Sequence, residues 1–480
     1  MDNNLRNNLW PEVNTIKTRE DTCPYHFQRQ AASQQDSSRG EEMQPNGKKC
    51  QPRFVATGGM GDPSWSKDGA FSLQTLRDRI EPWLTALVQS EHLSLLLGSG
   101  FSRAAAGLVG GKGQSMECTP FTAFGTEIED AAHQLSAKRG AVNMEDRFRV
   151  ASDLLKGLPI LKDARADLLR RELAEKKSAL VMGVLAGERE LAVAEAKARE
   201  KAWSLLVSFL MSFASRIGAK DRLGIFTTNY DRIIEEASDL AGLHLLDRFT
   251  GILSPVFRSS RLHVDMHYNP PGIRGEPRYL EGVARFTKLH GSVDWVQCGD
   301  LIRRIGLPFG AASIEPYLKV PGLPETNEAF GSLIYPTAAK DRETAEYPFV
   351  DLFRDFAAAI CQPNSTVFTY GYGFGDDHIN RVLKDMLTLP STHLVIISYD
   401  AVGGRIQRFW EGNEERKAQM TLLIGKDVAN LEALTRDFLP KSSIEVVTSR
   451  MAELLSKRYV ITGDSRDSAR NGDVEQGENA

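Results

Sequence analysis

The strongest candidate for acid–base chemistry is His290, in the run KLHGS at residues 288–292. An imidazole exchanges protons near neutral pH, which suits the work of a general base. A single histidine is more often a structural residue than a catalyst. His290 differs because it follows a predicted strand at 283–289, and because other predicted strands also end in polar residues. We therefore treat it as a candidate catalytic base.

A second polar cluster is the run TTNYD at residues 227–231, directly after the apolar run 223–226. Ligands of parallel α/β sheets bind beyond the carboxyl ends of the strands. A purely structural alternative is that Thr228 or Asn229 caps a helix beginning near Arg232. Such a cap explains one of these polar residues but not the whole run.

Two glycine loops also follow apolar runs, GSGFS at 98–102 and YGYGFGDD at 370–377. Glycines allow tight turns and let backbone N–H groups approach a phosphate at a helix N-terminus. The first loop is not a dinucleotide fingerprint, since Arg103 stands where the third glycine belongs, and Lys112 is not part of a P-loop. The structural alternatives are a tight turn for the first loop and an aspartate cap for a helix over 377–387 in the second. A shorter polar group, 398–400, follows the run 394–397 and is either a ribose contact or a turn.

The elements that must position these residues are short apolar strands separated by helical patterns. Strands are predicted over 93–97, 223–226, 283–289, 366–370, 394–397, 421–424 and 444–447. Strands alternating with helices predict βαβ units, and therefore an α/β fold with a mostly parallel sheet. The segments 249–279 and 307–329 are expected to be irregular.

A helical insertion is predicted at about 140–218, between the first two strands. The segment is rich in Ala, Leu, Glu, Lys and Arg, which favour helices. One helical face carries apolar side chains at three- and four-residue steps, namely Trp203, Leu206, Leu210, Phe213 and Ile217. The insertion is either a self-association surface or a helical lid packed on the sheet.

Composition sets the remaining limits. The chain has 480 residues with 59 Lys plus Arg and 63 Asp plus Glu, a formal charge of −4 that does not favour direct binding to nucleic acid. Five scattered cysteines without a CxxC fit a reducing compartment, and no signal peptide or apolar membrane span is evident, so a cytoplasmic location is expected. Residues 1–67 and 463–480 are polar and predicted to be disordered, which leaves one folded unit at 68–462.

Taken in chain order, the four motifs GSGFS, TTNYD, KLHGS and YGYGFGDD resemble the sirtuin-like family, and more specifically the zinc-free sirtuin-like domains of bacterial antiphage defence proteins. The resemblance spans about 93–447, with the helical insertion outside it. It implies a Rossmann-like domain with NAD as substrate, in which Asn229 and His290 form the catalytic pair and Asp231 supports them. It also implies contacts with NAD from the other motif residues, namely Gly98, Ser99, Gly100, Ser102, Thr228, Gly371, Gly373, Phe374, Ser398 and Asp400.

Departures from the family pattern decide which activity we expect. Sirtuin deacylases carry a PDFR-like segment after the first glycine loop and four zinc cysteines after the His-Gly pair. Residues 103–113 contain no such segment, and Cys298 is the only cysteine between His290 and Cys361. We therefore expect an NAD glycohydrolase without a metal, which releases nicotinamide and ADP-ribose and depletes NAD in antiphage defence. The alternatives are an NAD- or ADP-ribose-binding regulatory module and an NAD-dependent protein deacylase.

The same resemblance implies that activity is restrained until it is needed. The expected partners are further copies of the chain in a homo-oligomer, a HerA-type ATPase, or a phage-derived trigger. Binding to a membrane is not expected.

Overall fold

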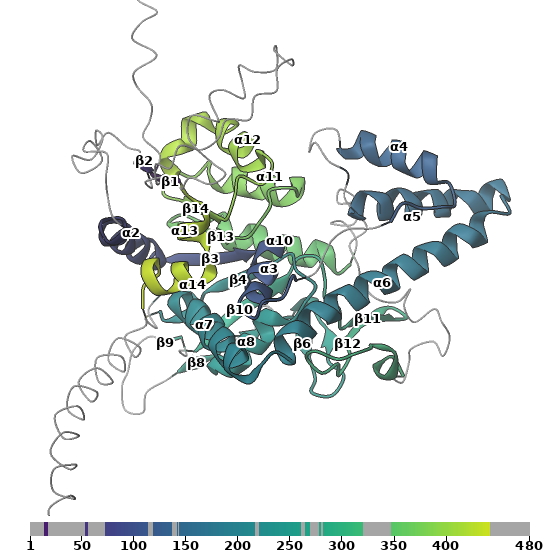
Figure 1. Ribbon diagram of the computed structural model, residues 1–480, viewed down its shortest axis with the longest axis horizontal. Helices are drawn as coiled ribbons and strands as arrows, with labels where there is room; N and C mark the ends of the chain where they lie inside the picture. The colour runs from purple at the N-terminus through teal and green to yellow at the C-terminus, as the bar shows by residue number, and fades with distance from the viewer. Residues whose placement is uncertain are drawn as a thin grey trace, which may run out of the picture.

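A nine-stranded sheet forms the centre of the fold (Figure 1). The computed structural model describes residues 14–17, 53–55, 73–113, 119–136, 142, 144–216, 220–260, 265–268, 278–279, 282–319 and 347–441. The strand order is β2-β1-β15-β14-β13-β3-β4-β10-β5. In chain order the strands are β1 (Asn14–Lys17), β2 (Arg53–Val55), β3 (His92–Leu97), β4 (Gly224–Thr227), β5 (His244–Leu246), β10 (Val283–Lys288), β13 (Ser365–Tyr370), β14 (His393–Ser398) and β15 (Met420–Ile424).

The seven strands from β15 to β5 run parallel, which confirms the predicted α/β fold with a Rossmann-like, mostly parallel sheet. Six of the predicted strands correspond to β3, β4, β10, β13, β14 and β15, and the seventh, at 444–447, lies outside the described residues. From β3 the chain continues to β4 on one side, and it later builds β13 on the other side of β3. The strand order therefore reverses between β3 and β13, and such a switch point is where ligands of open α/β sheets bind.

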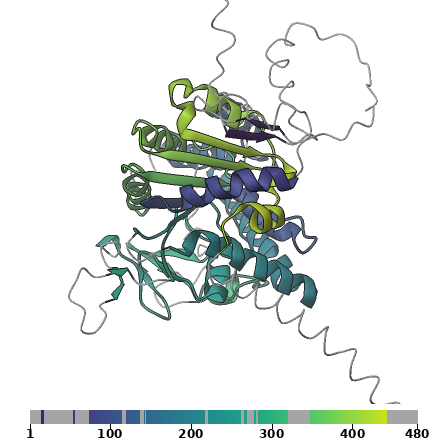
Figure 2. The same cartoon turned by 90° about the vertical axis from the view of Figure 1, so that its left-hand side faces the viewer.

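Helices cover both faces of the sheet, which explains why its strands are continuous apolar runs. In β3, Leu93, Leu95 and Leu97 face one layer, and Leu96 faces the other. The first layer contains α2 (Leu73–Val88), α3 (Ser99–Gly107), α7 (Ala196–Ala214), α8 (Ile233–Ala241), α13 (Lys426–Ala429), α14 (Leu431–Ala433) and the helical turn η7 (Leu434–Phe438). The second contains α10 (Phe349–Ile360), α11 (Asp377–Met386) and α12 (Arg405–Glu411). Figure 2 shows α2, in dark blue, running alongside the yellow-green strands of the C-terminal half.

Three further helices form an arm that reaches outward from the sheet in Figure 1. They are α4 (Gly125–Ser136), α5 (Met144–Leu161) and α6 (Ala166–Ala192), and they share an apolar core with Tyr230, with Val293 and Val296, and with the segment 305–318. By contrast, α7 packs on the sheet, where Leu206, Leu210 and Phe213 are fully buried. The predicted insertion at 140–218 therefore differs from the structure at both ends: helices begin at Gly125, and the last helix belongs to the layer that covers the sheet.

A small antiparallel sheet draws two of its four strands from the segment 249–279, where we expected irregular chain. Its order is β11-β12-β7-β6, built from β6 (Phe249–Thr250), β7 (Val256–Phe257), β11 (Trp295–Cys298) and β12 (Leu301–Arg304), and a separate hairpin pairs β8 (His267–Tyr268) with β9 (Arg278–Tyr279). The expectation for 249–279 was wrong at these strands, because two-residue strands are too short to show an alternating pattern. The aromatic rings of Phe249 on β6 and Trp295 on β11 pack together, 4.9 Å apart between centroids, although these strands are the two edges of the small sheet. In the segment 307–329 the structure describes the short turn η4 (Glu315–Tyr317) and nothing beyond residue 319, and a second such turn, η6 (Glu414–Gln419), precedes β15.

The segment 1–67, for which we expected no fold, contributes two short strands to the sheet edge. β1 pairs in parallel with β15, and β2 pairs antiparallel with β1, so the structure differs from the expectation there. The other residues of 1–67, and all of 463–480, lie outside the described residues. In the part of the chain that is described, no helix is long and apolar enough to cross a membrane.

Candidate active site

The two predicted glycine loops meet at the switch point of the sheet. A Cβ atom on Gly98 would lie 2.6 Å from the carbonyl oxygen of Gly371, and one on Gly100 would lie 2.6 Å from the Gly371 Cα atom. Gly371 has a φ of +64°, a conformation that favours glycine. The Gly98 N–H donates to the Tyr370 carbonyl (3.1 Å) and the Gly100 N–H to the Gly371 carbonyl (2.9 Å). These glycines therefore pack the two loops together, and two of the N–H groups expected to meet a phosphate already have partners within the protein.

Ser99, between these glycines, is the exposed first residue of α3. The N-terminus of a helix carries a partial positive charge and free N–H groups, which suits an anion. The part of the first glycine loop that is open to a ligand is thus Ser99.

Asn229, Ser102 and Asp231 form one hydrogen-bonded cluster. The Asn229 amide donates through Nδ2 to the Gly98 carbonyl (2.9 Å) and to Ser102 Oγ (2.8 Å). The Ser102 hydroxyl in turn donates to Asp231 Oδ2 (2.5 Å). Both amide hydrogens of Asn229 are used, and among the described residues its Oδ1 has no hydrogen-bond partner. Because an amide oxygen only accepts, Asn229 is set to receive a hydrogen bond from a hydroxyl group or a water molecule.

Ser102 has a different place from the one predicted for it. The resemblance implies that it contacts the pyrophosphate, whereas its hydroxyl bridges two residues of the predicted catalytic set. A sequence motif shows which strand end a residue follows, but not which side chain of another loop lies opposite it.

The loop that carries Asn229 is fixed by the strand before it. Thr227 donates through Oγ1 to the Leu97 carbonyl (3.0 Å), accepts the Asn229 N–H on the same oxygen (3.0 Å), and is fully buried. The half-buried Thr228 donates its N–H to the same carbonyl (3.1 Å). Neither Thr228 nor Asn229 caps α8, whose N-cap residue is Arg232, without a side-chain hydrogen bond. Asp231 lies one residue before this N-cap, and its Oδ1 accepts the N–H of Ile233 (3.3 Å) near the positive end of the helix.

His290 forms a buried pair with Asp376, a residue of the second glycine loop. The distance from His290 Nε2 to Asp376 Oδ2 is 2.8 Å, and the two residues are 6% and 3% exposed. Asp376 is also the N-cap of α11, since its Oδ1 accepts the His378 N–H (3.2 Å), as the aspartate cap predicted. A carboxylate that accepts both bonds places the ring proton of His290 on Nε2 and leaves Nδ1 as the basic nitrogen.

The sequence motif offered only the capping role for Asp376. The pair with His290 could have been anticipated only by knowing that β10 and β13 end at the same edge of the sheet. The glycine after His290 also has a structural reason, since Gly291 has a φ of +83°.

The second glycine loop faces an arginine that the sequence analysis did not single out. Cβ atoms on Gly373 and Gly375 would lie 3.4 and 3.2 Å from the two terminal nitrogens of Arg405, at the start of α12. A guanidinium group suits phosphate oxygens through its planar set of donors. Phe374, a predicted NAD contact, is 4% exposed, and its ring packs 4.9 Å from that of Tyr372. Its side chain is part of the core.

Ser398 is the last residue of β14 and Asp400 follows this strand, and the two residues differ in exposure. Ser398 is 4% exposed, and its carbonyl accepts the Gly425 N–H (3.0 Å). Asp400 is exposed, and its Oδ1 accepts the Val402 N–H (2.7 Å). Among the described residues, no hydrogen bond joins either residue to Asn229 or His290. Of the two, Asp400 has the side chain that is open to a ligand.

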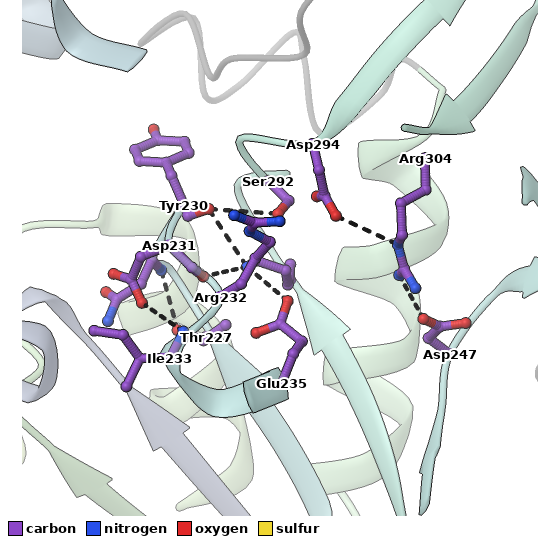
Figure 3. A network of polar contacts seen from close by, with 12 residues as sticks. Thr227, Tyr230, Asp231, Arg232, Ile233, Glu235, Asp247, Ser292, Asp294 and Arg304 are labelled. Atoms are coloured by element: carbon purple, nitrogen blue, oxygen red, sulfur yellow. Dashed lines mark hydrogen bonds and ion pairs between the residues drawn. The ribbon is translucent and has the colours of Figure 1, made fainter. Parts of the chain in front are cut away.

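Beside the loops of Asn229 and His290 lies a network of partly buried charges (Figure 3). Figure 3 shows Asp294 and Asp247 on either side of Arg304, whose Nη2 lies 2.5 Å from Asp247 Oδ2. Arg232, directly after Asp231, forms a buried ion pair with Glu188 of the helical arm, with 2.5 Å between Nη2 and Oε2. The loop that carries Asn229 is therefore tied to α6.

The described residues contain no group of three or more His, Cys, Asp or Glu side chains that could hold a metal ion. Within the same residues, Cys298 and Cys361 are free thiols, and burial raises the pKa of both. The candidate site is thus built from amide, hydroxyl, imidazole and carboxylate groups.

Comparison with known proteins gives one family match. A family model described as a SIR2-like domain matches residues 223–416, which supports a sirtuin-like assignment and a relation to NAD. The matched range begins at β4 and includes Asn229, His290, Asp376 and Arg405, whereas the first glycine loop lies before it. No curated protein matches the chain.

Proposed function

We propose, on the premise of this SIR2-like match, that the protein is an NAD glycohydrolase. The observation that carries the proposal is the pairing of two groups on neighbouring loops. Asn229 presents a hydrogen-bond acceptor that its own contacts leave unused, and His290 presents a basic nitrogen fixed by Asp376. Both follow adjacent parallel strands, β4 and β10, next to the switch point.

NAD carries features that correspond to groups at this edge of the sheet. Its pyrophosphate is anionic, and the exposed N-terminus of α3 at Ser99 and the Arg405 guanidinium both suit an anion. Its ribose hydroxyls are donors, which suits the acceptor on Asn229. The exposed carboxylate of Asp400 suits the hydroxyls of the adenosine ribose.

The chemistry required is cleavage of the bond between the nicotinamide nitrogen and ribose C1′. The bonding electrons leave with the nitrogen, so nicotinamide departs as a neutral base without a strong acid, while positive charge develops on the ribose. A water oxygen then bonds to C1′, and its proton passes to Nδ1 of His290. Asn229 holds the ribose hydroxyl or the water through Oδ1, which removes part of the orientation cost. Ser102 and Asp231 keep the amide of Asn229 in the required orientation.

Water is the favoured acceptor because the sequence lacks the deacylase zinc module. Deacylases of the resembling family carry four zinc cysteines after the His-Gly pair, whereas this chain has only Cys298 between His290 and Cys361. In the cell such an activity would deplete NAD, and we propose this as an antiphage defence held in check by self-association, by an ATPase partner or by a phage-derived trigger.

The test is nicotinamide release from NAD by the purified full-length protein and its variants. We expect Asn229→Ala and His290→Ala to lose release by at least about 100-fold while still binding NAD in calorimetry, since general-base contributions are of this size. His244→Ala, at an exposed histidine of β5, is the matched control and should keep wild-type release.

Three outcomes would contradict the proposal. Unchanged nicotinamide release by either of these two variants would show that the substituted residue is not catalytic. Binding of NAD without release by the wild type would favour a regulatory module. Release that requires an acylated peptide would favour a deacylase.

A further inference from the structure

A lysine lies buried directly below the two catalytic loops. Lys288 is the last residue of β10, two positions before His290, and its side chain is 1% exposed. Burying an ammonium group is costly unless it is paired and hydrogen-bonded. Its place at the end of a core strand would suit an apolar side chain, so the contacts of its charged end require an explanation.

The ammonium group of Lys288 contacts the loop that carries Asn229. It donates to the Asp231 carbonyl, lies 3.5 Å from the Tyr230 carbonyl, and pairs with Glu235 Oε1 at 2.9 Å. An ammonium group has three donors, and these three oxygens match them. Two of the three are backbone oxygens directly after Asn229, so the cation acts on the main chain of that loop.

The Tyr230 carbonyl also joins the loop of Asn229 to the loop of His290. The Tyr230 carbonyl accepts the Val293 N–H at 3.0 Å and lies 3.4 Å from the Ser292 hydroxyl, the contact drawn in Figure 3. The Tyr230 oxygen is thus contacted by residues that come before and after His290 in the sequence, namely Lys288, Ser292 and Val293. The relative position of the two catalytic loops depends on this group of contacts.

We infer that Lys288 is a positioning residue for NAD cleavage, which holds the loop of Asn229 in register with the loop of His290. The inference rests on the proposed hydrolase function. Glu235 supplies the counter-charge from α8, and the other charged groups of this network are Asp294, Arg304 and Asp247, from the loop before β11, from β12 and from the loop before β6.

Replacement of both members of the ion pair separates this role from a purely structural one. Removing one partner of a buried pair destabilises the fold, whereas replacing both partners by apolar residues is often neutral or stabilising. In Lys288→Met the unfolding temperature and kcat should both fall. In the double variant Lys288→Met with Glu235→Leu the unfolding temperature should recover, but kcat should stay low, because the carbonyls of Tyr230 and Asp231 still lack their cation.

The expected kinetic effect is on kcat rather than on KM. Displacement of a reacting group by about 1 Å costs on the order of 100-fold in rate, so kcat should fall about 100-fold in both variants while KM stays within about threefold. The matched control is Arg248→Met, which breaks a buried ion pair with Asp355, 4% and 7% exposed. Among the described residues, no hydrogen bond or ion pair joins Arg248 to either loop. This variant should lose stability but keep kcat.

Hydrogen exchange gives a readout that does not depend on activity. In the full-length double variant, amides of residues 228–232 should exchange faster than in the wild type, while those of β14 should not change. Recovery of kcat together with stability in the double variant, or unchanged exchange at 228–232, would overturn the inference. If wild-type protein releases no nicotinamide, the hydrolase proposal fails. Faster exchange in the double variant would then show that Lys288 stabilises the loop without a role in catalysis, and this result would also overturn the inference.

Discussion

The pairing of His290 with Asp376 predicts what happens when one carboxylate oxygen of Asp376 is replaced by an amide NH₂. In Asp376→Asn the side chain keeps its shape, and its oxygen can still accept the His378 N–H that caps α11, now made at 3.2 Å. Asparagine and aspartate are about equally good caps, so stability should change by less than about 1 kcal/mol. The amide NH₂, however, now faces Nε2 of His290, where the carboxylate accepted a bond at 2.8 Å.

The consequence for catalysis follows from which ring nitrogen carries the proton. An amide donor opposite Nε2 makes that nitrogen the acceptor and moves the proton to Nδ1, so the base that faces the substrate is lost. General-base catalysis contributes about 10²- to 10⁴-fold, so kcat should fall by about 1,000-fold, equivalent to about 4 kcal/mol in the barrier. Binding of NAD should be nearly unchanged, since the substitution lies behind the histidine.

The assay is steady-state release of nicotinamide, with thermal unfolding measured on the same preparations. Asp377→Asn is the matched control, because Asp377 is the neighbouring acid of the same helix turn and is exposed. It should keep kcat within about twofold. A kcat of Asp376→Asn above half the wild-type value, or an equal loss in Asp377→Asn, would refute the reasoning.

Three further predictions concern binding and stability. Arg405→Ala should raise KM for NAD by about 10-fold or more with little change in kcat, since a hydrogen bond to a charged group contributes about 1.5–3 kcal/mol; equal KM values would contradict this. Glu188→Leu should lower the free energy of unfolding in urea by about 3–5 kcal/mol, because it leaves Arg232 buried without its partner; a loss below 1 kcal/mol would argue against it. Burial lowers the pKa of His393 from 6.5 to about 4, so the unfolded chain binds the proton more readily. The contribution of His393 to the free energy of unfolding is therefore fully present above about pH 6.5, and up to about 3 kcal/mol of it is lost as the pH drops toward 4. In urea unfolding at pH 7 and pH 4.5, His393→Gln should show a smaller difference between the two pH values than the wild type.

The core of the fold was predictable because its strands are buried on both faces. Continuous apolar runs such as 93–97 and 394–397 can only be accommodated between two helical layers, and both became strands of the parallel sheet. The short strands at 249–250 and 256–257 could not be predicted, because two residues give no period. The sequence left two alternatives open for the apolar face of α7, a self-association surface and packing on the sheet, since the apolar face of a helix does not show which surface it contacts.

The candidate site was predictable in its residue types and strand ends, but not in its pairings. Strand-end polarity pointed to Asn229 and His290, whose loops the sheet brings together. The partners of these residues are Ser102 of α3 and Asp376, the N-cap of α11, which are distant in sequence and meet only through the strand order around β3 and β13. The sequence did not point to Arg405, because a single arginine forms no recognisable motif with the two glycines that it contacts only in the folded chain.

The central claim is that this site cleaves NAD with water. Its most direct measurement is chromatography of the products after incubation of the full-length protein with NAD in ¹⁸O-labelled water. The account predicts nicotinamide and ADP-ribose in equal amounts, with one ¹⁸O atom in the ADP-ribose, and neither product from His290→Ala. Intact NAD in the presence of folded protein that binds it, or ADP-ribose without the label, would contradict the account.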